Sequence, residues 1–294
     1  MDTAKEISEF LTSRRARISP SDVALPGGGV RRVPGLRRTE VAMLAGVSVE
    51  YYGRLERGEL AGASDSVLDA LATALRMDEA ERAHLFDLAK AAAGSSSLRP
   101  KRRTGRWVTP PGLQLTLDAI TAGPAFIRNG RMDILAANLL GRAFYEPVFA
   151  FDGAHPNIAR FQFLDEEHSR DFYPEWDVAA DIAVAILRTE AGRAPNDRDL
   201  QDLIGELSTR SNDFRRRWGA HDVRHHSAGV KTFAPPLIGP VTLHYQAAEL
   251  VGEAGLTMTV YTADPGSPAE ERLRLLASWA ADQPRAVPAP APRD

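Results

Sequence analysis

Residues 36–58 read LRRTEVAMLAGVSVEYYGRLERG, and this stretch decides the fold of the first third of the chain. Thr39 can cap a short helix, and Gly46 follows that helix as the turn residue. Ser48 can cap a second helix, which Gly58 is well suited to end. Two short helices joined by a glycine-containing turn of this length predict a helix-turn-helix.

Three more helices are expected around this pair. Apolar residues at helical spacing predict helices over about 3–15, 64–75 and 78–92. Asp78 has Glu81 three residues later, which is the pattern of a capping box at a helix start. The sequence therefore predicts an all-α, five-helix helix-turn-helix domain over residues 1–95.

Charge is distributed unevenly along the 294 residues. Residues 1–110 contain 18 Lys and Arg against 14 Asp and Glu, whereas the remainder contains 18 against 25. Seven arginines and a single acid lie between residues 14 and 38. Neutralisation of phosphates by such a cluster makes binding to nucleic acid strongly dependent on salt. A basic first third beside an acidic remainder favours a DNA-binding region joined to a separate domain.

The second helix of a helix-turn-helix enters the major groove of double-stranded DNA with its N-terminal side chains at the base edges. Arginine reads guanine through two hydrogen bonds, and glutamate accepts one from cytosine. The candidates for base contacts are Ser48, Glu50, Tyr51 and Arg54. The candidates for phosphate contacts, which position the protein without reading sequence, are Arg31, Arg32, Arg37, Arg38 and Thr39. The alternative is a small helical bundle with a solvated arginine-rich loop.

The run 36–58, with Arg14-Arg15-Ala16-Arg17 and Pro34-Gly35 before it, resembles an XRE-type helix-turn-helix. More narrowly, it resembles that of the MmyB-like transcriptional regulators. The resemblance covers the whole N-terminal domain. It implies that Glu56 has a structural role, bonding back to the helix pair, and does not read a base.

The rest of the chain has a different pattern. Residues 96–110 are small, polar and then basic, as in an interdomain linker. Asn129-Gly130 is a strong hairpin signal between strands over 124–128 and 131–138. Helices are expected near 172–192 and 197–211, then strands at 229–233, 240–247 and 256–261, and a last helix from Pro268. This order predicts an α+β, PAS-like domain with an antiparallel sheet over 111–282, followed by a Pro/Ala-rich, disordered tail over 283–294.

Four segments of this second domain resemble the ligand-binding domain of the MmyB-like regulators: 129–138, 218–223, 229–231 and 260–267. The resemblance implies a sensor for a medium- to long-chain fatty acid or a similar amphipathic molecule. The chain departs from the family at Ala137, where a tryptophan often precedes the asparagine. A smaller residue there alters the pocket that the family would lead one to expect.

A sensor pocket needs an apolar wall and a few convergent polar groups. The candidates for the wall are Phe126, Leu135, Phe144, Phe161, Phe163, Phe172, Trp176, Ile182, Ile186, Trp218, Leu243 and Tyr245. The candidates for binding an anionic head group are Arg160, Arg188, His221 and His225. The alternative for the apolar set is an ordinary hydrophobic core. No metal site is expected at His221, His225 and His226, because no carboxylate or cysteine completes the ligand set.

Several classes of protein are excluded by what the sequence lacks. It has no cysteine, so disulfides and thiolate metal sites are absent. No run of about 18 apolar residues predicts a membrane span, and the N-terminus does not resemble a signal peptide, so a cytoplasmic protein is expected. No catalytic motif is present, so neither an enzyme nor a bound cofactor is predicted.

These features together predict a regulator that binds DNA as a homodimer, since helix-turn-helix proteins match paired half-sites. Two alternatives remain open. In one, the C-terminal domain binds no ligand and serves as a dimerisation or protein-contact module. In the other, a hydrolase or oxidoreductase is fused to a DNA-binding domain, although no motif favours it.

Overall fold

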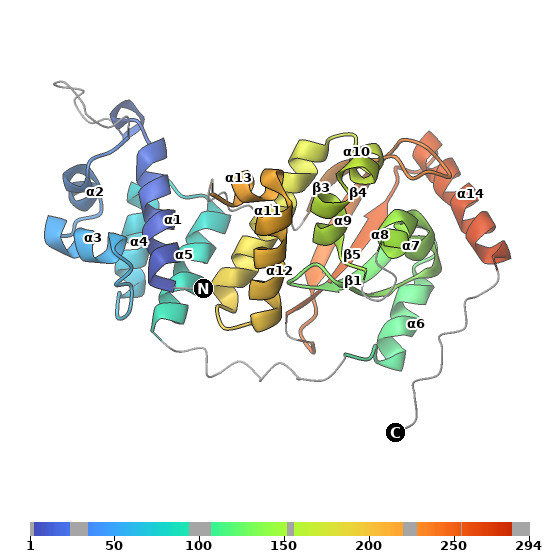
Figure 1. Ribbon diagram of the computed structural model, residues 1–294, viewed down its shortest axis with the longest axis horizontal. Helices are drawn as coiled ribbons and strands as arrows, with labels where there is room; N and C mark the ends of the chain where they lie inside the picture. The colour runs from blue at the N-terminus through green and yellow to red at the C-terminus, as the bar shows by residue number, and fades with distance from the viewer. Residues whose placement is uncertain are drawn as a thin grey trace.

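The computed structural model describes residues 3–23, 35–93, 107–151, 156–219, 228–253 and 255–283. Figure 1 shows an all-helical part at one end and a larger part with a sheet at the other. Buried apolar side chains form one cluster within residues 7–89 and two further clusters within residues 117–276. The separate cores agree with a helical domain followed by an α+β domain.

Five α-helices surround the core of the first domain, counted over its described residues. Their bounds, with a short 3-10 helix after the first, are α1 (Thr3–Arg17), η1 (Pro20–Val23), α2 (Arg38–Leu44), α3 (Val49–Glu56), α4 (Asp65–Ala74) and α5 (Glu79–Ala92). The predicted five-helix domain is confirmed, including the capping box of Asp78 and Glu81 at the start of α5.

The start of α2 differs from the expectation that Thr39 caps it. The N-cap is Arg37, whose backbone N–H donates to the Glu40 carboxylate at 2.6 Å. Glu40 therefore satisfies a free backbone donor at this helix end, and Thr39 lies inside the first turn.

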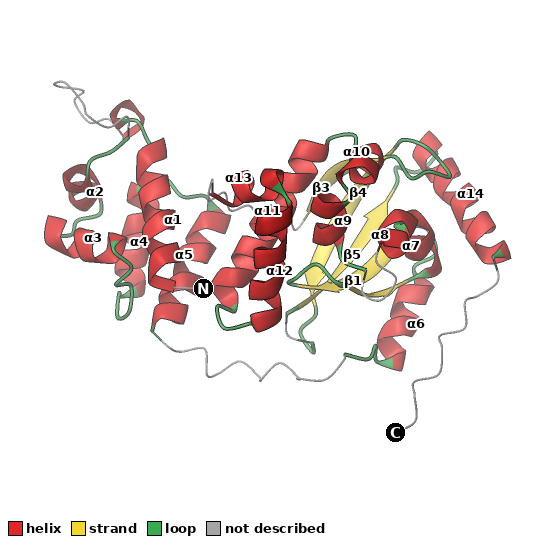
Figure 2. Ribbon diagram, in the orientation of Figure 1, coloured by secondary structure: helices red, strands yellow, loops and turns green. Residues whose placement is uncertain are grey.

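The second domain is built on a five-stranded sheet, shown in yellow in Figure 2. The strands are β1 (Ala125–Asn129), β2 (Ile134–Ala137), β3 (Ala228–Phe233), β4 (Val241–Glu249) and β5 (Leu256–Thr262). Their order is β2-β1-β5-β4-β3, and every neighbouring pair is antiparallel. The predicted strands are all present, with ends displaced by at most three residues.

The helices of the second domain are more numerous than the sequence led us to expect. Within the described residues they are α6 (Pro111–Ala119), α7 (Leu139–Phe144), α8 (Glu146–Phe151), α9 (Ile158–Leu164), α10 (Glu166–Phe172), α11 (Trp176–Arg193), α12 (Arg198–Arg210), α13 (Asn212–Gly219) and α14 (Pro268–Asp282). The single helix predicted over 172–192 is divided: α10 ends at Phe172 and α11 begins at Trp176. Pro174 separates them, because a residue before proline avoids the helical conformation.

The two faces of the sheet bury different amounts of apolar surface. On one face, the rings of Phe144, Tyr145, Phe172, Phe233 and Tyr261 pack edge to face, tilted or stacked at centroid distances of 5.1–6.3 Å. On the other face, α6 covers a smaller cluster that includes Ile127 and Leu256. Most of the predicted wall residues belong to or pack against the larger core, whereas Leu135 packs against the smaller one.

Asn138 fixes the junction between β2 and α7. Its side-chain oxygen accepts from the backbone N–H groups of Gly141 and Ala125, and its amide donates to the carbonyls of Ile120 and Gly123. The residue is buried, so it acts as a helix cap that also ties in the loop before β1. No helix within the described ranges is long and apolar enough to cross a bilayer.

Candidate DNA-binding surface and ligand pocket

Local sequence signals position helix α3 as a recognition helix. Gly46 adopts φ +65°, a left-handed conformation that glycine tolerates without strain, and it turns the chain between α2 and α3. The Ser48 hydroxyl then accepts from the Tyr51 N–H at 3.1 Å and caps α3. Ser48 at the N-cap is exposed, as are Glu50 and Arg54, which lie one turn apart on α3. The helix therefore presents a polar face to solvent.

The two largest side chains of that face support each other. The Arg54 guanidinium lies over the Tyr51 ring, 5.3 Å from its centroid. Such a contact holds a planar guanidinium in one orientation and reduces the freedom that it loses on binding. Arg54 is thus a partly ordered donor aimed away from the domain core.

Glu56, at the end of α3, joins the helix-turn-helix to α1. It is almost completely buried and accepts from Arg15 Nε at 2.6 Å and from Arg38 Nε. Arg15 also donates to the Leu36 carbonyl at 2.9 Å. The hydrogen bond and the charge of Glu56 raise the pKa of Arg38. Glu56 is thus a structural residue, as the resemblance implied.

The phosphate candidates lie at the start of α2. Arg37, Arg38 and Thr39 are exposed there, although part of the Arg38 guanidinium is committed to Glu56. Arg31 and Arg32 lie outside the described residues. Helices α2 and α3 contact each other, and both carry exposed polar or basic residues, as expected of a surface that binds in a groove of DNA.

The predicted apolar wall is divided between three environments. Phe126, Phe144 and Phe161 are packed in the closed aromatic core. Leu135 lies on the opposite face of the sheet, against the cluster under α6. Trp176 is buried, and its ring lies 3.9 Å from the guanidinium carbon of Arg170. The structure therefore does not gather these residues around one cavity.

The cations predicted to bind a head group already have acidic partners. Arg160 Nε donates to Glu206 at 2.8 Å. Arg188 is fully buried and donates to Glu6 of α1 at 2.6 Å, so it pairs with the DNA-binding domain. Its guanidinium also donates to the Trp218 carbonyl and lies 4.3 Å from the centroid of the Trp218 ring. His221 and His225 lie outside the described residues.

The contact between the domains is made mainly by α11 against α5, which lie side by side in Figure 1, and the Arg188–Glu6 pair links α11 to α1. Arg193 bridges Asp87 of α5 at 3.2 Å and Glu249 of β4 at 2.9 Å. At Gly192 an added Cβ would lie 2.8 Å from the His84 ring, so the two helices approach closely only because this residue lacks a side chain. The interface is both charged and tightly packed.

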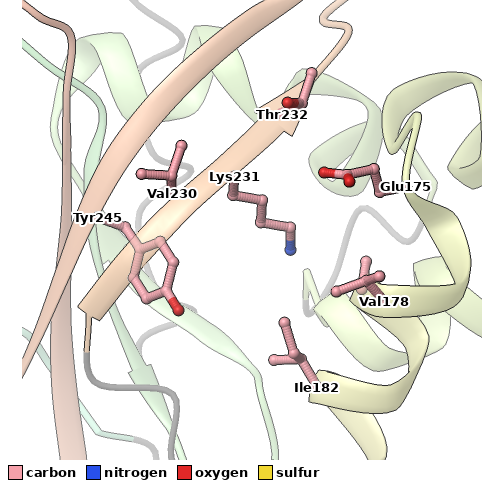
Figure 3. A pocket seen from close by; sticks show the side chains of 8 residues that line it. Glu175, Val178, Ile182, Val230, Lys231, Thr232 and Tyr245 are labelled. Carbon is pink, nitrogen blue, oxygen red and sulfur yellow. The ribbon is translucent and has the colours of Figure 1, made fainter.

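A small cavity of about 40 Å³ opens between the first half of α11 and strands β3 and β4 (Figure 3). Its lining residues are Glu175, Val178, Ala179, Ile182, Val230, Lys231, Thr232 and Tyr245. Two of the predicted wall residues, Ile182 and Tyr245, lie here. Lys231 was not predicted as a ligand residue, because a lysine in a strand is usually expected to point into solvent.

The Lys231 side chain points into this cavity (Figure 3). Its ammonium lies 4.4 Å from the Tyr173 ring centroid and 5.2 Å from that of Phe233. Burial lowers the pKa of Lys231 to about 7. Within the described parts of the chain, no carboxylate forms an ion pair with it.

A wider hollow of about 480 Å³ lies beside β4 and the start of α14 and is open to solvent. Its charged groups already have partners: His244 contacts Asp264 at 3.0 Å, and Arg272 donates to the Pro240 carbonyl. The smaller cavity is therefore the stronger candidate for recognising a charged ligand.

Comparison with known families gives two matches. A family model described as a helix-turn-helix domain matches residues 6–85. The model of the MmyB-like transcription regulator ligand binding domain matches residues 109–276, which is more than half of the chain. No significant match was found among curated proteins. The two matched ranges correspond to the helical domain and to the domain that contains the sheet.

Proposed function

This chain belongs to the MmyB-like transcription regulators, and from that premise we propose a one-component regulator whose C-terminal domain senses a small amphipathic molecule. It is a DNA-binding regulator, because a helix-turn-helix domain is joined to the family's ligand-binding domain. The observation that carries the DNA-binding mechanism is the exposed polar face of α3, held in place by the buried Glu56.

In the proposed complex, α3 lies in the major groove. Arg54 donates to a guanine and Glu50 accepts from a base, while Arg37, Arg38 and Thr39 contact phosphates. A homodimer would place two such helices on the half-sites of a palindromic operator. This dimer is proposed from the general behaviour of helix-turn-helix proteins.

The proposed ligand is a fatty acid or a similar amphipathic molecule, and we infer a PAS-like fold for its domain. Two strands, a set of helices and three further antiparallel strands support that inference. Ligand binding would shift the balance between arrangements of the two domains through α11, and so change operator affinity.

A ligand-free contact module is the second candidate for the C-terminal domain. The closed packing of Phe126, Phe144 and Phe161 favours it, because ligand sites for drug-sized molecules usually have volumes of about 300–1,000 Å³. In that case the domain would hold partner molecules together and no small molecule would alter DNA binding.

A titration separates these candidates. The purified protein is titrated against fluorescently labelled DNA from its own upstream region, followed by anisotropy, with and without a saturated fatty acid. Specific binding whose affinity shifts with the acid supports the sensor. Specific binding that the acid leaves unchanged favours the contact module, and no specific binding contradicts the operator assignment.

Arg54→Ala tests the recognition surface. The variant is expected to weaken specific DNA binding by about 1–3 kcal/mol, because it removes a two-bond contact with a base. Arg82→Ala is the matched control, since it removes the same charge from an exposed position on α5. Equal affinity for the parent and a folded Arg54→Ala protein would contradict the role of Arg54.

A further inference from the structure

Lys231 differs from the other cations considered for the ligand site. Arg160 is neutralised by Glu206, and Arg188 is neutralised by Glu6. The Lys231 ammonium instead faces aromatic rings and has no carboxylate partner in the described residues. Taking a charge out of water without a counter-ion is unfavourable. The protein retains this arrangement although a neutral side chain would fill the space at less cost.

The opening of the cavity is apolar. Val178 of α11 and Val230 of β3 are 49% and 58% exposed, and both line it together with Ile182. A cation at the bottom and exposed valines at the rim make an amphipathic site. The rim residues come from two elements, so a ligand seated there would contact both α11 and the edge of the sheet.

We propose that this cavity binds the carboxylate of a small amphipathic monoanion, with Lys231 as its counter-ion and the apolar tail along Val178, Ile182 and Val230. The proposal rests on the sensor role proposed above. It adds to that role the location of the binding site and the charge of the ligand. The ammonium would donate to the carboxylate while the Tyr173 ring keeps it in position.

Size and charge narrow the ligand class. A cavity of about 40 Å³ has room for a carboxylate but not for a long acyl chain, which must lie at the rim. Glu175 lines the same cavity, so a dianion such as a phosphate monoester would be repelled. A ligand with one carboxylate therefore fits this site better than a dianion, because Lys231 attracts the first negative charge and Glu175 repels a second.

Binding would also change the protonation of the site. Without a ligand, burial lowers the pKa of Lys231 to about 7, so a large fraction of the side chain is neutral at neutral pH. A bound carboxylate favours the charged form and raises that pKa. Carboxylate binding is therefore expected to be coupled to proton uptake, a signature that a purely apolar ligand would not produce.

The test uses the full chain and octanoate as the probe, with octanol as the uncharged comparison. The lysines, which number four in the whole sequence, are labelled by reductive ¹³C-methylation, which keeps their charge, and Lys231→Met assigns the Lys231 signal. We expect octanoate to raise the pKa of Lys231 and octanol to leave it unchanged. The absence of a shift up to the solubility limit of octanoate would overturn the proposal.

Variants give a second readout by calorimetry. Lys231→Met is expected to weaken octanoate binding roughly tenfold to a hundredfold without weakening octanol binding, whereas Lys231→Arg retains most of the affinity. Glu175→Gln leaves the lysine in place and should tighten octanoate binding by removing repulsion. Lys90→Met on α5 is the control for loss of a lysine. Unchanged octanoate affinity in Lys231→Met, or weaker binding in Glu175→Gln, would overturn the site.

The failure of the site and the failure of the sensor give different results. If octanoate shifts Lys231 but leaves DNA affinity unchanged, the site stands and the sensor role fails. If octanoate changes the DNA affinity of parent and Lys231→Met equally, the sensor stands and the site lies elsewhere, which overturns this proposal.

Discussion

Arg188 and Lys231 are both cations of the C-terminal domain, and they differ in whether an acidic side chain neutralises them. Arg188 is fully buried, with Glu6 2.6 Å away and the Trp218 carbonyl as a further acceptor. Lys231 is half-buried and faces two rings, and no acid of the described residues forms an ion pair with it, although Glu175 lines the same cavity. A buried charge that is neutralised within the protein holds structure together. One that is not neutralised is available to an external anion.

The same helix connects the two cations. Val178, Ala179 and Ile182 in the first half of α11 line the Lys231 cavity, and Arg188 lies in its second half, against α1. A ligand that displaces the first half of a continuous helix also acts on the contact with the DNA-binding domain. The pocket and the interface are therefore placed to influence each other, provided that α11 has two arrangements.

The largest effect is expected from breaking the neutralised pair. Glu6→Gln removes the carboxylate from a buried arginine, which typically destabilises by about 3–5 kcal/mol. Since Glu6 and Arg188 belong to different domains, the loss should appear first as undocking, measured by faster hydrogen exchange in α11. Urea unfolding would then measure the total loss of unfolding free energy.

Two further variants make this result specific. Glu9→Gln changes a partly exposed acid on the same helix, whose ion pair with Lys5 is open to solvent, and should have almost no effect. Replacing Glu6 and Arg188 together by leucine should recover much of the lost stability, because no buried charge is left behind. Equal effects of Glu6→Gln and Glu9→Gln would show that the Arg188 pair is not what holds the domains together.

A smaller effect is expected at Glu56. This buried acid neutralises Arg15 and Arg38, but Arg38 reaches solvent, so its charge is not stranded when the acid is lost. Glu56→Gln should lower the unfolding free energy of the first domain by about 1–3 kcal/mol and weaken DNA binding as α3 loses its anchor. Thermal unfolding and anisotropy measure the two effects. If Glu56→Gln were destabilised but bound DNA with normal affinity, the contacts of Glu56 would not be needed for DNA recognition.

Lys231→Met should instead change how stability depends on pH. The folded pKa is about 7 and the unfolded value is 10.5, so between them the unfolded chain holds a proton that the folded chain lacks. The Lys231 contribution therefore makes stability rise with pH across this window. Its unfavourable effect is fully present below pH 7.

The methionine variant lacks this contribution. Its stability advantage over the parent should be greatest below pH 7 and shrink toward pH 10.5, as measured by urea unfolding across that range. Glu175, Tyr173 and Tyr245, the other titratable groups around the ammonium, are common to both proteins. A stability difference that does not vary with pH would mean that Lys231 keeps an ordinary pKa.

The DNA-binding domain could be predicted from sequence because its signals are local. Ser48, Gly46 and Gly58 act within one or two turns of their own positions, and each does what the sequence indicated. The prediction from local signals was wrong at Thr39. At the start of α2, the free backbone N–H of Arg37 donates to the Glu40 carboxylate, and Thr39 is not the N-cap. Strand alternation was equally local, and all five strands were found.

The ligand site could not be predicted because it depends on contacts between distant segments. Arg188 was a reasonable choice for binding an anion until the fold brought Glu6, 182 residues earlier, against it. Lys231 gave no signal of its own, since Tyr173 and Phe233 surround it only after β3 packs beside the end of α10. The sequence shows which residues carry charge, but only the fold shows which charges are already neutralised.

The smallest effect is expected where pairing occurs without burial. Arg131 donates to Asp199 at 2.7 Å, nearly the distance of the Arg188 pair, but Asp199 is 75% exposed. Water solvates both charges when this contact breaks, so Asp199→Asn should change the unfolding free energy by less than about 1 kcal/mol. Asp133 contacts the same arginine from a more buried position. Burial by itself raises the pKa of Asp133, but hydrogen bonds from Asn129 and Asn157 together with Arg131 lower it overall. Asp133→Asn should therefore destabilise more than Asp199→Asn in urea unfolding. If both variants lost the same unfolding free energy, burial would not explain why the Arg188 pair contributes more to stability than the surface pairs. The difference between Arg188 and Lys231 would then need another explanation.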